Sequence, residues 1–294
     1  MKTLVVTAAD EAYSALLLDL LHSLRAAPNC RVACLDLGLS EATRTLIAPL
    51  VHQVLRPEWP FRAHPVFDAR PTYLARAVRP FLSRYFPGYE TYIWLDADCW
   101  LQDPNALATL TFAASAGSIA AVPAADRSYF HSTEHRDWVQ RRYEMAFGKQ
   151  DAHRLRPFPY VNSGVFALKE NARHWVLWEA RFQAALDRWE GEFLSDQALL
   201  NALIYLDGLP AELLPAEYNW ICHLRPPIWS RARRKFINPN FPRTDIGLVH
   251  NTLNDKNAAL TVPMLEGGTV TVPMTYRGYA ALVAWTEANA HTAP

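Results

Sequence analysis

The stretch Tyr92-Ile93-Trp94-Leu95-Asp96-Ala97-Asp98-Cys99-Trp100 is a hydrophobic strand that ends in two acids separated by one small residue. Strand periodicity predicts that Asp96 and Asp98 lie on the same side of the chain. At the carboxyl end of a central parallel strand, where open α/β folds bind ligands, a divalent cation would relieve the repulsion between these carboxylates. Oxygen ligands favour Mg²⁺ or Mn²⁺, which also bridge phosphates. The alternative is that both acids cap the helix expected after Pro104.

Strand and helix patterns alternate on the N-terminal side of this stretch. Leucines at helical spacing fill residues 10–26, and Ser40 is a suitable N-cap for the next helix. The expected elements are strands at 3–7, 31–37 and 91–95 and helices at 10–26, 40–51 and 72–85. This alternation predicts an α/β fold in which helices cover a mostly parallel sheet.

The alternation loosens after residue 100. The expected elements there are strands at 119–123 and 165–168 and helices at 170–189 and 195–205. No linker rich in Gly, Ser or Pro divides the chain, so we expect one continuous domain over residues 1–260. Thr261-Val262-Pro263-Met264 recurs as Thr271-Val272-Pro273-Met274, which predicts a hairpin, and residues 261–294 then form a C-terminal hairpin and helical tail.

Composition excludes several classes of protein. Hydrophobic residues make up 50% of the 294 residues and charged residues 20%, which excludes a disordered chain. Basic and acidic residues balance at 29 each, so we expect no nucleic-acid partner. The one basic segment, 225–243, is either a solvated loop or a peripheral membrane contact. Four cysteines without a C-x-x-C pair, and no apolar run long enough for a transmembrane segment, predict a cytoplasmic protein.

Glycine is scarce, with 11 residues in the whole chain. The chain has no G-x-G-x-x-G, G-x-x-x-x-G-K-[ST] or G-x-S-x-G motif, so the common backbone cradles for phosphate and the hydrolase nucleophile turn are missing. If this protein binds phosphates, side chains or a metal ion must neutralise them.

Further motifs surround the acidic pair in a fixed order. They are Thr72-Tyr73-Leu74-Ala75-Arg76, Leu95-Asp96-Ala97-Asp98, Tyr160-Val161-Asn162-Ser163-Gly164-Val165-Phe166, Leu194-Ser195-Asp196-Gln197-Ala198-Leu199-Leu200-Asn201, Leu214-Pro215-Ala216-Glu217-Tyr218-Asn219, and Val249-His250 with Lys256 six residues later. This series resembles the family 8 glycosyltransferases, retaining enzymes with a GT-A fold that use nucleotide sugars. The last motif departs from the family pattern at Asn251, Leu253 and Asn257, where the family's glycine turn is missing.

The resemblance implies a mixed sheet with a Rossmann-like N-terminal half, a UDP-sugar donor and an acceptor that the motifs do not identify. It also implies Mn²⁺ or Mg²⁺ held by Asp96, Asp98 and His250, which offer two oxygens and a nitrogen. Lys256 matches the family's diphosphate lysine.

Roles in donor binding and catalysis follow from the same resemblance. Asp196 would hold the sugar hydroxyls, and Gln197 would lie under the anomeric carbon. Transfer with retention would take a front-face route, in which the leaving phosphate assists the acceptor. The other residues implied to bind the donor are Thr7, Ala8, Asp10, Tyr13, Arg76, Asp96, Ala97, Asn162, Ser163, Gly164 and Lys256.

Other interpretations of these residues stay open. His250 fits a core histidine, Asn162 a turn at the start of a strand, and Asp196 an acid favoured at a helix N-terminus. The stretch His131-Ser132-Thr133-Glu134-His135 matches the H-x-x-E-H order of some zinc metallopeptidases, in which His131, Glu134 and His135 share a helix. A non-catalytic nucleotide-sugar-binding protein would keep the same motifs.

The acceptor site has its own candidates. Sugar faces stack on indole rings, so Trp220 and Trp229, together with the arginines of 225–243, are the residues expected to line it.

Overall fold

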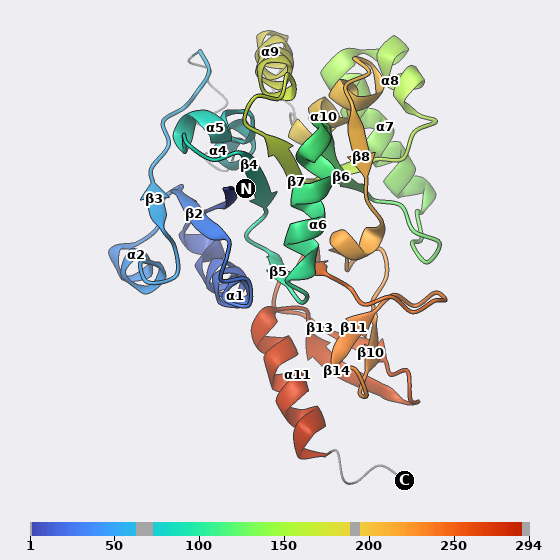
Figure 1. Ribbon diagram of the computed structural model, residues 1–294. Coiled ribbons are helices and arrows are strands. Elements are labelled where there is room, and N and C mark those ends of the chain that lie inside the picture. The colour runs from blue at the N-terminus through green and yellow to red at the C-terminus, as the bar shows by residue number, and fades with distance from the viewer. Residues whose placement is uncertain (1, 63–72, 189–194, 290–294) are drawn as a thin grey trace.

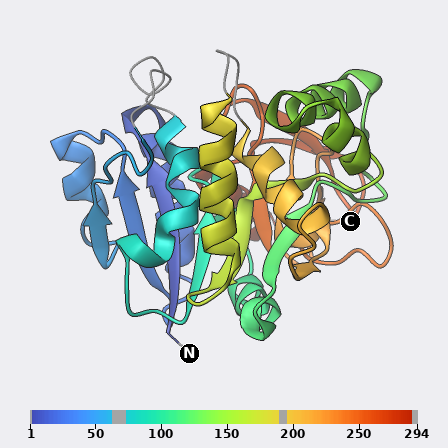
Figure 2. The same cartoon turned by 90° about the horizontal axis from the view of Figure 1, so that it is seen from above.

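The computed structural model describes residues 2–62, 73–188 and 195–289. At its centre is a seven-stranded sheet with helices on both faces (Figures 1 and 2). The strands β1 to β4 are parallel, β7 is antiparallel to both of its neighbours, and β8 is parallel to β6. In spatial order the strands are β3 (Gln53–Leu55), β2 (Arg31–Asp36), β1 (Thr3–Ala9), β4 (Thr91–Leu95), β7 (Val161–Lys169), β6 (Ile119–Pro123) and β8 (Ala211–Leu213). The predicted α/β fold with a mixed, mostly parallel sheet is confirmed.

Two groups of helices cover the two faces of this sheet. Successive strand residues point to opposite sides, so each face has its own hydrophobic core. Leu4 and Val6 of β1 pack in one core, and Val5 and Ala9 pack in the other. The helical segments of the first face are α4 (Leu74–Ala77), η3 (Arg79–Phe81), α5 (Leu82–Tyr85), α9 (His174–Asp187) and α10 (Asp196–Tyr205). Those of the second are α1 (Ser14–Leu24), which follows η1 (Glu11–Tyr13), α2 (Glu41–Ile47), and α6 (Asn105–Ala113) with η4 (Ala114–Ala116).

Smaller elements surround this three-layer body. Helices α7 (Thr133–Phe147) and α8 (Lys149–Leu155) pack against α10 through Tyr143, Leu155 and Ala198. A second sheet contains β5 (Cys99–Leu101), β12 (Leu248–His250) and β9 (Trp220–Ile221), which follows η5 (Ala216–Tyr218). Two hairpins, β10 (Ile228–Ser230) with β11 (Lys235–Ile237) and β13 (Ala259–Pro263) with β14 (Thr269–Pro273), lie beside α11 (Tyr276–Ala288) at the C-terminal end (Figure 1).

Most of the elements expected from sequence are present. The strands at 91–95 and 119–123 match β4 and β6, and Ser40 and Ser195 are the N-caps of α2 and α10. The strand expected at 165–168 begins earlier, at Val161, and the helix expected at 170–189 is α9, which begins at His174; residue 189 is outside the described residues.

The single helix expected at 72–85 is wrong. The chain forms the three short pieces α4, η3 and α5 instead, because Pro80 has no N–H to donate within a helix. Thr72 is outside the described residues. The break leaves Arg79 in the 3₁₀ turn η3, buried under the sheet.

The hairpin expected near the C-terminus is formed by β13 and β14. Thr261 pairs with Thr271, and Val262 and Val272 are buried in one core with Trp100. Strand β13 begins at Ala259, slightly before residue 261, where the hairpin was expected to begin. In the part of the chain that is described, no helix is both long and apolar enough to cross a bilayer.

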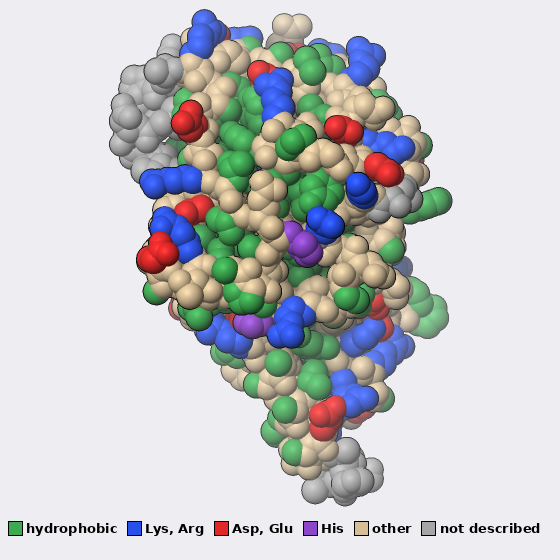
Figure 3. Space-filling model, turned by 60° about the vertical axis from the view of Figure 1, so that its left-hand side comes forward, with side chains coloured by type: hydrophobic (Ala, Val, Ile, Leu, Met, Phe, Trp, Pro, Cys, Tyr) green, Lys and Arg blue, Asp and Glu red, His purple; other side chains and the backbone are tan. Residues whose placement is uncertain are grey.

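Acids pair with three of the basic side chains in the segment 225–243. Arg233 lies 3.0 Å from Asp245, and Lys235 lies 3.0 Å from both Asp103 and Asp245. Arg234 pairs with Glu287 of α11. Basic and acidic side chains are likewise interspersed on the face shown in Figure 3.

Candidate active site

A pocket of about 370 Å³ lies at the carboxyl ends of β1 and β4. These strands are adjacent and parallel, while the chain leaves β1 toward β2 on the other side, so this is the point where the strand order reverses. Open α/β sheets bind ligands at such a point. The residues that line the pocket are Ala8, Ala9, Asp10, Tyr13, Leu37, Ala75, Arg76, Arg79, Asp96, Ala97 and Asp98.

The acidic pair lies in a turn between β4 and β5. The Cys99 N–H donates to the Asp96 carbonyl at 2.9 Å, so the strand does not continue through Asp98. The expectation that strand periodicity sets the two acids on one side is therefore wrong, and it is the turn that brings them to the pocket. Neither acid caps the next helix, because Asp103 accepts the Asn105 N–H there.

Asp98 faces two groups from the C-terminal half of the chain. Strand β12 pairs antiparallel with β5 and places His250 opposite Cys99. The His250 Nε2 lies 3.2 Å from Asp98 Oδ1, and the Lys256 Nζ lies 2.7 Å from Asp98 Oδ2. Burial opposes the charge on Asp98, but His250 and Lys256 outweigh it and lower the pKa of this carboxyl. Asp98 is therefore ionised at neutral pH.

A chain of amides holds the His250 ring. The His250 Nδ1 lies 2.9 Å from Asn219 Oδ1, the Asn219 amide donates to Asn162 Oδ1 at 3.0 Å, and the Gly164 N–H donates to that oxygen at 2.8 Å. His250 Nε2 is thus directed at the acids. Asn219 ends the motif 214–219 of the family resemblance, but no role at the site was expected for it.

Gly164 is required by close packing. A Cβ at this position would lie 2.5 Å from His250 Cε1 and 2.7 Å from Asp96 Oδ2. Real side chains do not come so close to a Cβ, so only glycine allows His250 and Asp96 to approach each other across β7.

Arg79 is the main residue that sequence reasoning missed. Its guanidinium is buried, lies over the Trp94 ring at 5.1 Å, and donates to Asp96 at 2.6 Å, to Ser163 at 2.6 Å and to Asp196. Burial alone would lower the pKa of Arg79, but Asp196 and Asp96 raise it. The sequence signal that could have identified Arg79 is that it is the only charged residue in the apolar run 77–82.

Arg76, the arginine expected at the site, lies at its edge. It lines the pocket, and its Nε is 3.6 Å from Asp196 Oδ1. Burial lowers the pKa of Arg76, and the carboxylate of Asp196 offsets part of that effect.

The N-terminus of α10 brings Asp196 and Gln197 to the same place. The Ser195 hydroxyl accepts the Ala198 N–H, which fixes the first turn. Asp196 is buried and accepts the Ser163 hydroxyl at 2.9 Å, while Gln197 Oε1 accepts the Asn162 amide at 3.2 Å and the Ser163 N–H at 3.3 Å. Leu194, the first residue of this expected motif, is outside the described residues.

Of the residues at the end of β1 and just after it that were expected to bind the donor, three line the pocket and one does not. Ala8, Asp10 and Tyr13 line the pocket, and Tyr13 is 39% exposed. Thr7 is completely buried and is not among the lining residues. Asp10 accepts the Tyr13 N–H at 3.2 Å, so its carboxylate also caps η1.

The chemistry of the side chains fits a divalent cation. Among the described residues, Asp98, Cys99 and His250 have ligand atoms that all lie within 4.8 Å of one another. Burial raises the pKa of Cys99, which keeps its thiol protonated and leaves the carboxylate and imidazole as donors. Asp96 Oδ2 lies 3.9 Å from His250 Nε2, and the other Asp96 oxygen bonds Arg79. Asp98 and His250 are thus close enough to hold one ion, and Asp96 lies at the edge of this group.

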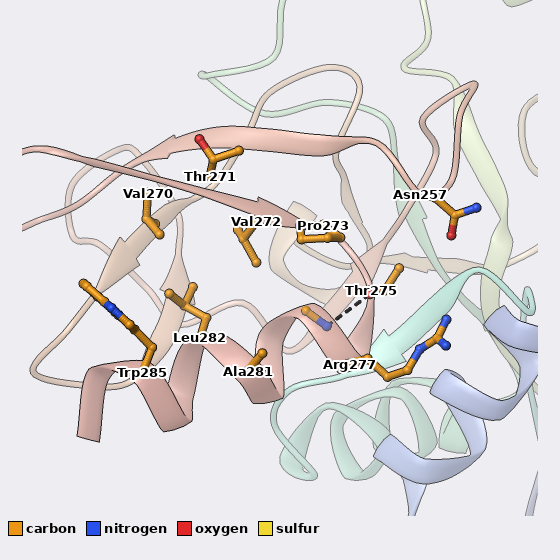
Figure 4. Close-up of a pocket in the computed structure, with 11 residues that line it drawn as sticks. Asn257, Val270, Thr271, Val272, Pro273, Thr275, Arg277, Ala281, Leu282 and Trp285 are labelled. Carbon is orange, nitrogen blue, oxygen red and sulfur yellow. Dashed lines mark hydrogen bonds between the residues drawn. The ribbon is translucent and has the colours of Figure 1, made fainter. Parts of the chain in front are cut away.

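Two other regions do not provide such a site. Helix α7 begins at Thr133 with Ser132 as its N-cap, so His131 precedes the helix and the H-x-x-E-H geometry of a peptidase is not formed. A pocket of about 670 Å³ between β14 and α11 is lined by apolar residues such as Leu282 and Trp285, and contains no acid (Figure 4).

The expected role of two tryptophans is also wrong. Trp220 and Trp229 are completely buried, where they pack against Tyr129 and Phe236. Their rings are therefore part of the core and present no face to an acceptor sugar.

Comparison with known proteins gives likenesses of structure. No protein-family model matches the chain, and no curated protein does. The galactosyltransferase LgtC, solved in complex with donor and acceptor sugar analogues, is 19% identical with a TM-score of 0.54, and the match covers 85% of this chain and 87% of that one.

Two further solved structures show the same likeness. The bifunctional glycosyltransferase WbbM is 15% identical with a TM-score of 0.59, over 97% of this chain and 50% of that one. Mouse xyloside xylosyltransferase 1 is 14% identical with a TM-score of 0.51, over 86% of this chain and 97% of that one. The predicted fold is thereby confirmed: this chain has the GT-A fold of these glycosyltransferases.

Proposed function

We propose that this protein is a metal-dependent glycosyltransferase that transfers the sugar of a UDP-sugar, with retention, to an acceptor. The observation that carries the proposal is the meeting of Asp98, His250 and Lys256 beside the pocket of a GT-A fold. A cation site next to an ammonium group is suited to a diphosphate leaving group, whose charge is the main cost of the reaction.

The leaving diphosphate would be bound by Lys256 and the acidic turn. The Lys256 Nζ donates to Asp98 Oδ2 and to the Asn251 carbonyl, both at 2.7 Å, and an ammonium group has three donors. The third is available for a phosphate oxygen. Mn²⁺ or Mg²⁺ held by Asp96, Asp98 and His250 would neutralise the remaining charge of the diphosphate.

The nucleoside would lie against β1. Tyr13 offers a partly exposed ring at the pocket, suited to stack on uracil, and Ala8 and Ala97 leave room for the ribose. Burial raises the pKa of Tyr13, and Asp98 adds to this effect, so the ring stays neutral at neutral pH.

The transferred sugar would lie between β7 and α10. Asn162 and Ser163 donate to the Gln197 side chain, which would hold it under the sugar. Asp196, fixed by Arg79, would accept sugar hydroxyls, and it would favour the positive charge that develops on the sugar. The family resemblance supports retention by the front-face route.

The direct test is release of UDP from a panel of UDP-sugars with Mn²⁺. We expect turnover of at least one donor, and loss of turnover in Gln197→Ala with UDP binding retained. The control Gln183→Ala, which replaces a half-buried glutamine on α9 that bonds Asp187, should have no effect. UDP binding without turnover of any donor would instead support the non-catalytic binder. Failure to bind UDP, GDP or TDP would contradict both.

The compartment is a further part of the proposal. All four cysteines are free thiols, three of them buried, which suits a reducing environment. We therefore assign the activity to the cytoplasm.

A further inference from the structure

Four ring side chains lie together outside the donor pocket, and none of them is among the residues that line it. The His131 and His135 rings are 5.0 Å apart, His135 lies 6.0 Å from Trp138, and His135 lies 6.4 Å from His223, measured between ring centres. They come from the start of α7 and from the segment after β9, which are far apart in sequence. We name these four residues the ring cluster.

The ring cluster reaches the active site from two directions. His223 follows β9, where the Cys222 N–H donates to the carbonyl of His250 at 3.3 Å, and the His223 Nδ1 lies 2.7 Å from the Thr252 hydroxyl. On the other side, Trp138 lies edge-on to Tyr160 at 6.3 Å, and the Tyr160 hydroxyl is 3.4 Å from that of Ser195, directly before Asp196. The cluster thus borders both the cation ligands and the residues placed at the sugar.

The ring cluster is accessible to solvent. Trp138 is 37% exposed, His223 is exposed, and His131 and His135 are half-buried. A solvent-facing indole offers a surface that suits the C–H face of a sugar ring. Imidazole rings at its edge offer hydrogen bonds to the hydroxyls of the same sugar.

The histidines of the cluster are neutral at neutral pH. Burial lowers the pKa of His131 and of His135. The pKa of His223 is lowered to about 4, because the residues packed against one side of its ring partly desolvate it, although its other side reaches solvent, and because a proton on it would be repelled by protonated His135 or His250 and by Lys256. A neutral imidazole has one donor and one acceptor, as a hydroxyl group does, whereas an anionic ligand is best bound by a cation. The chemistry favours uncharged hydroxyl groups over phosphate or carboxylate.

We propose that the ring cluster, His131, His135, Trp138 and His223, is the acceptor subsite and that the acceptor is an uncharged carbohydrate. The proposal rests on the proposed glycosyl transfer, in which the acceptor hydroxyl must approach the sugar held by Asp196 and Gln197. It replaces the buried Trp220 and Trp229 with aromatic residues that solvent reaches.

The probes are methyl glycosides of glucose, galactose, mannose and N-acetylglucosamine, observed by saturation-transfer NMR with UDP and Mn²⁺ present. At least one should give signals with the unmodified protein. Trp138→Ala and His223→Ala should each weaken its binding about tenfold, the effect of losing one contact of this kind. The matched controls Trp285→Ala and His153→Ala replace exposed residues elsewhere and should leave it unchanged.

Three results would overturn the subsite: no signal from any glycoside, signals that persist in both variants, or stronger binding of the corresponding sugar phosphates. Titration of UDP into the same samples separates this proposal from the transferase. If every variant binds UDP and the glycoside signals are the same in Trp138→Ala as in the unmodified protein, the subsite alone is refuted. Glycoside signals that depend on Trp138 without UDP binding refute the transferase alone. UDP binding by Trp138→Ala also shows that this variant is folded.

Discussion

Single side chains at this site serve several partners at once. Arg79 satisfies Asp96 and Asp196 together, and Asn162 links Gly164, Asn219 and Gln197. The family resemblance implied that Asp98, His250 and Lys256 act as a group, and the structure brings the three side chains together. Motif spacing in the sequence could not indicate Arg79. This residue precedes Asp96 by 17 residues and Asp196 by 117, and contacts over such separations leave no local pattern in the sequence.

Replacing Arg79 should show how much the buried charges depend on it. Arg79→Gln leaves two carboxylates short of a partner, and breaking a buried pair in this way costs about 3–5 kcal/mol of the free energy of unfolding. Urea unfolding measures the change. The control Arg84→Gln removes the pair of Arg84 with Glu179, which is more exposed and should cost less than about 1 kcal/mol. Equal losses in the two variants would refute this role of Arg79.

The ring cluster predicts an acid-sensitive fold. The pKa of His223 is lowered from 6.5 to about 4, so the unfolded chain binds a proton more readily than the folded one. The contribution of His223 to stability is therefore fully present above pH 6.5 and is lost as the pH falls toward 4. Thermal unfolding from pH 7 to pH 4 should show a smaller decrease for His223→Asn than for the unmodified protein. Parallel pH profiles would contradict the lowered pKa.

At the scale of elements, strands and the first residues of helices could be predicted from the sequence. The broken helix at 73–85 and the turn at 96–98 could not. Local patterns decide β4 and the serine caps of α2 and α10, since each needs only neighbouring residues. The segment 73–85 was misjudged because its amphipathic spacing persists across Pro80, which interrupts the backbone hydrogen bonds. The turn at 96–98 was missed because it depends on pairing of β5 with β12, far along the chain.

The start of α10 links an element to the chemistry. Ser195→Ala removes its cap and should cost about 1 kcal/mol of stability. It should also lower the rate of UDP release, because Asp196 and Gln197 occupy the first turn. Ser40→Ala removes the corresponding cap of α2. We expect a similar loss of stability there with unchanged UDP release, and a normal rate in Ser195→Ala would show that the cap does not position the site.

At the scale of the whole molecule, the site is closed by contacts between distant parts of the chain. The N-terminal Rossmann-like half supplies Asp98, and His250 and Lys256 come from strand β12 and the loop after it. The sequence order predicted the α/β sheet and its ligand-binding edge, because both follow from the alternation of elements. The arrangement of β5, β9 and β12 was not predictable from such short strands.

The C-terminal hairpin and α11 should be needed for the fold. They cover Trp100, Trp229 and Phe236, and burial of each such ring contributes about 2–3 kcal/mol. A chain that ends at residue 258 should be insoluble or lack a cooperative thermal transition, whereas one that ends at residue 289 should unfold like the 294-residue chain. A soluble, cooperatively folded chain of residues 1–258 would show that this core is dispensable.

The central claim is that a cation held by Asp98 and His250 binds the diphosphate of UDP. Calorimetric titration of UDP, with Mn²⁺ and with a chelator, tests it in the unmodified protein, in Asp98→Asn and in Asp207→Asn, whose carboxylate pairs with Arg181 away from the site. We predict that Mn²⁺ strengthens UDP binding by at least about tenfold, the equivalent of about 1.4 kcal/mol, in the unmodified protein and in Asp207→Asn, and has no effect in Asp98→Asn. Binding of UDP that is independent of Mn²⁺, or that keeps its Mn²⁺ dependence in Asp98→Asn, would contradict the claim.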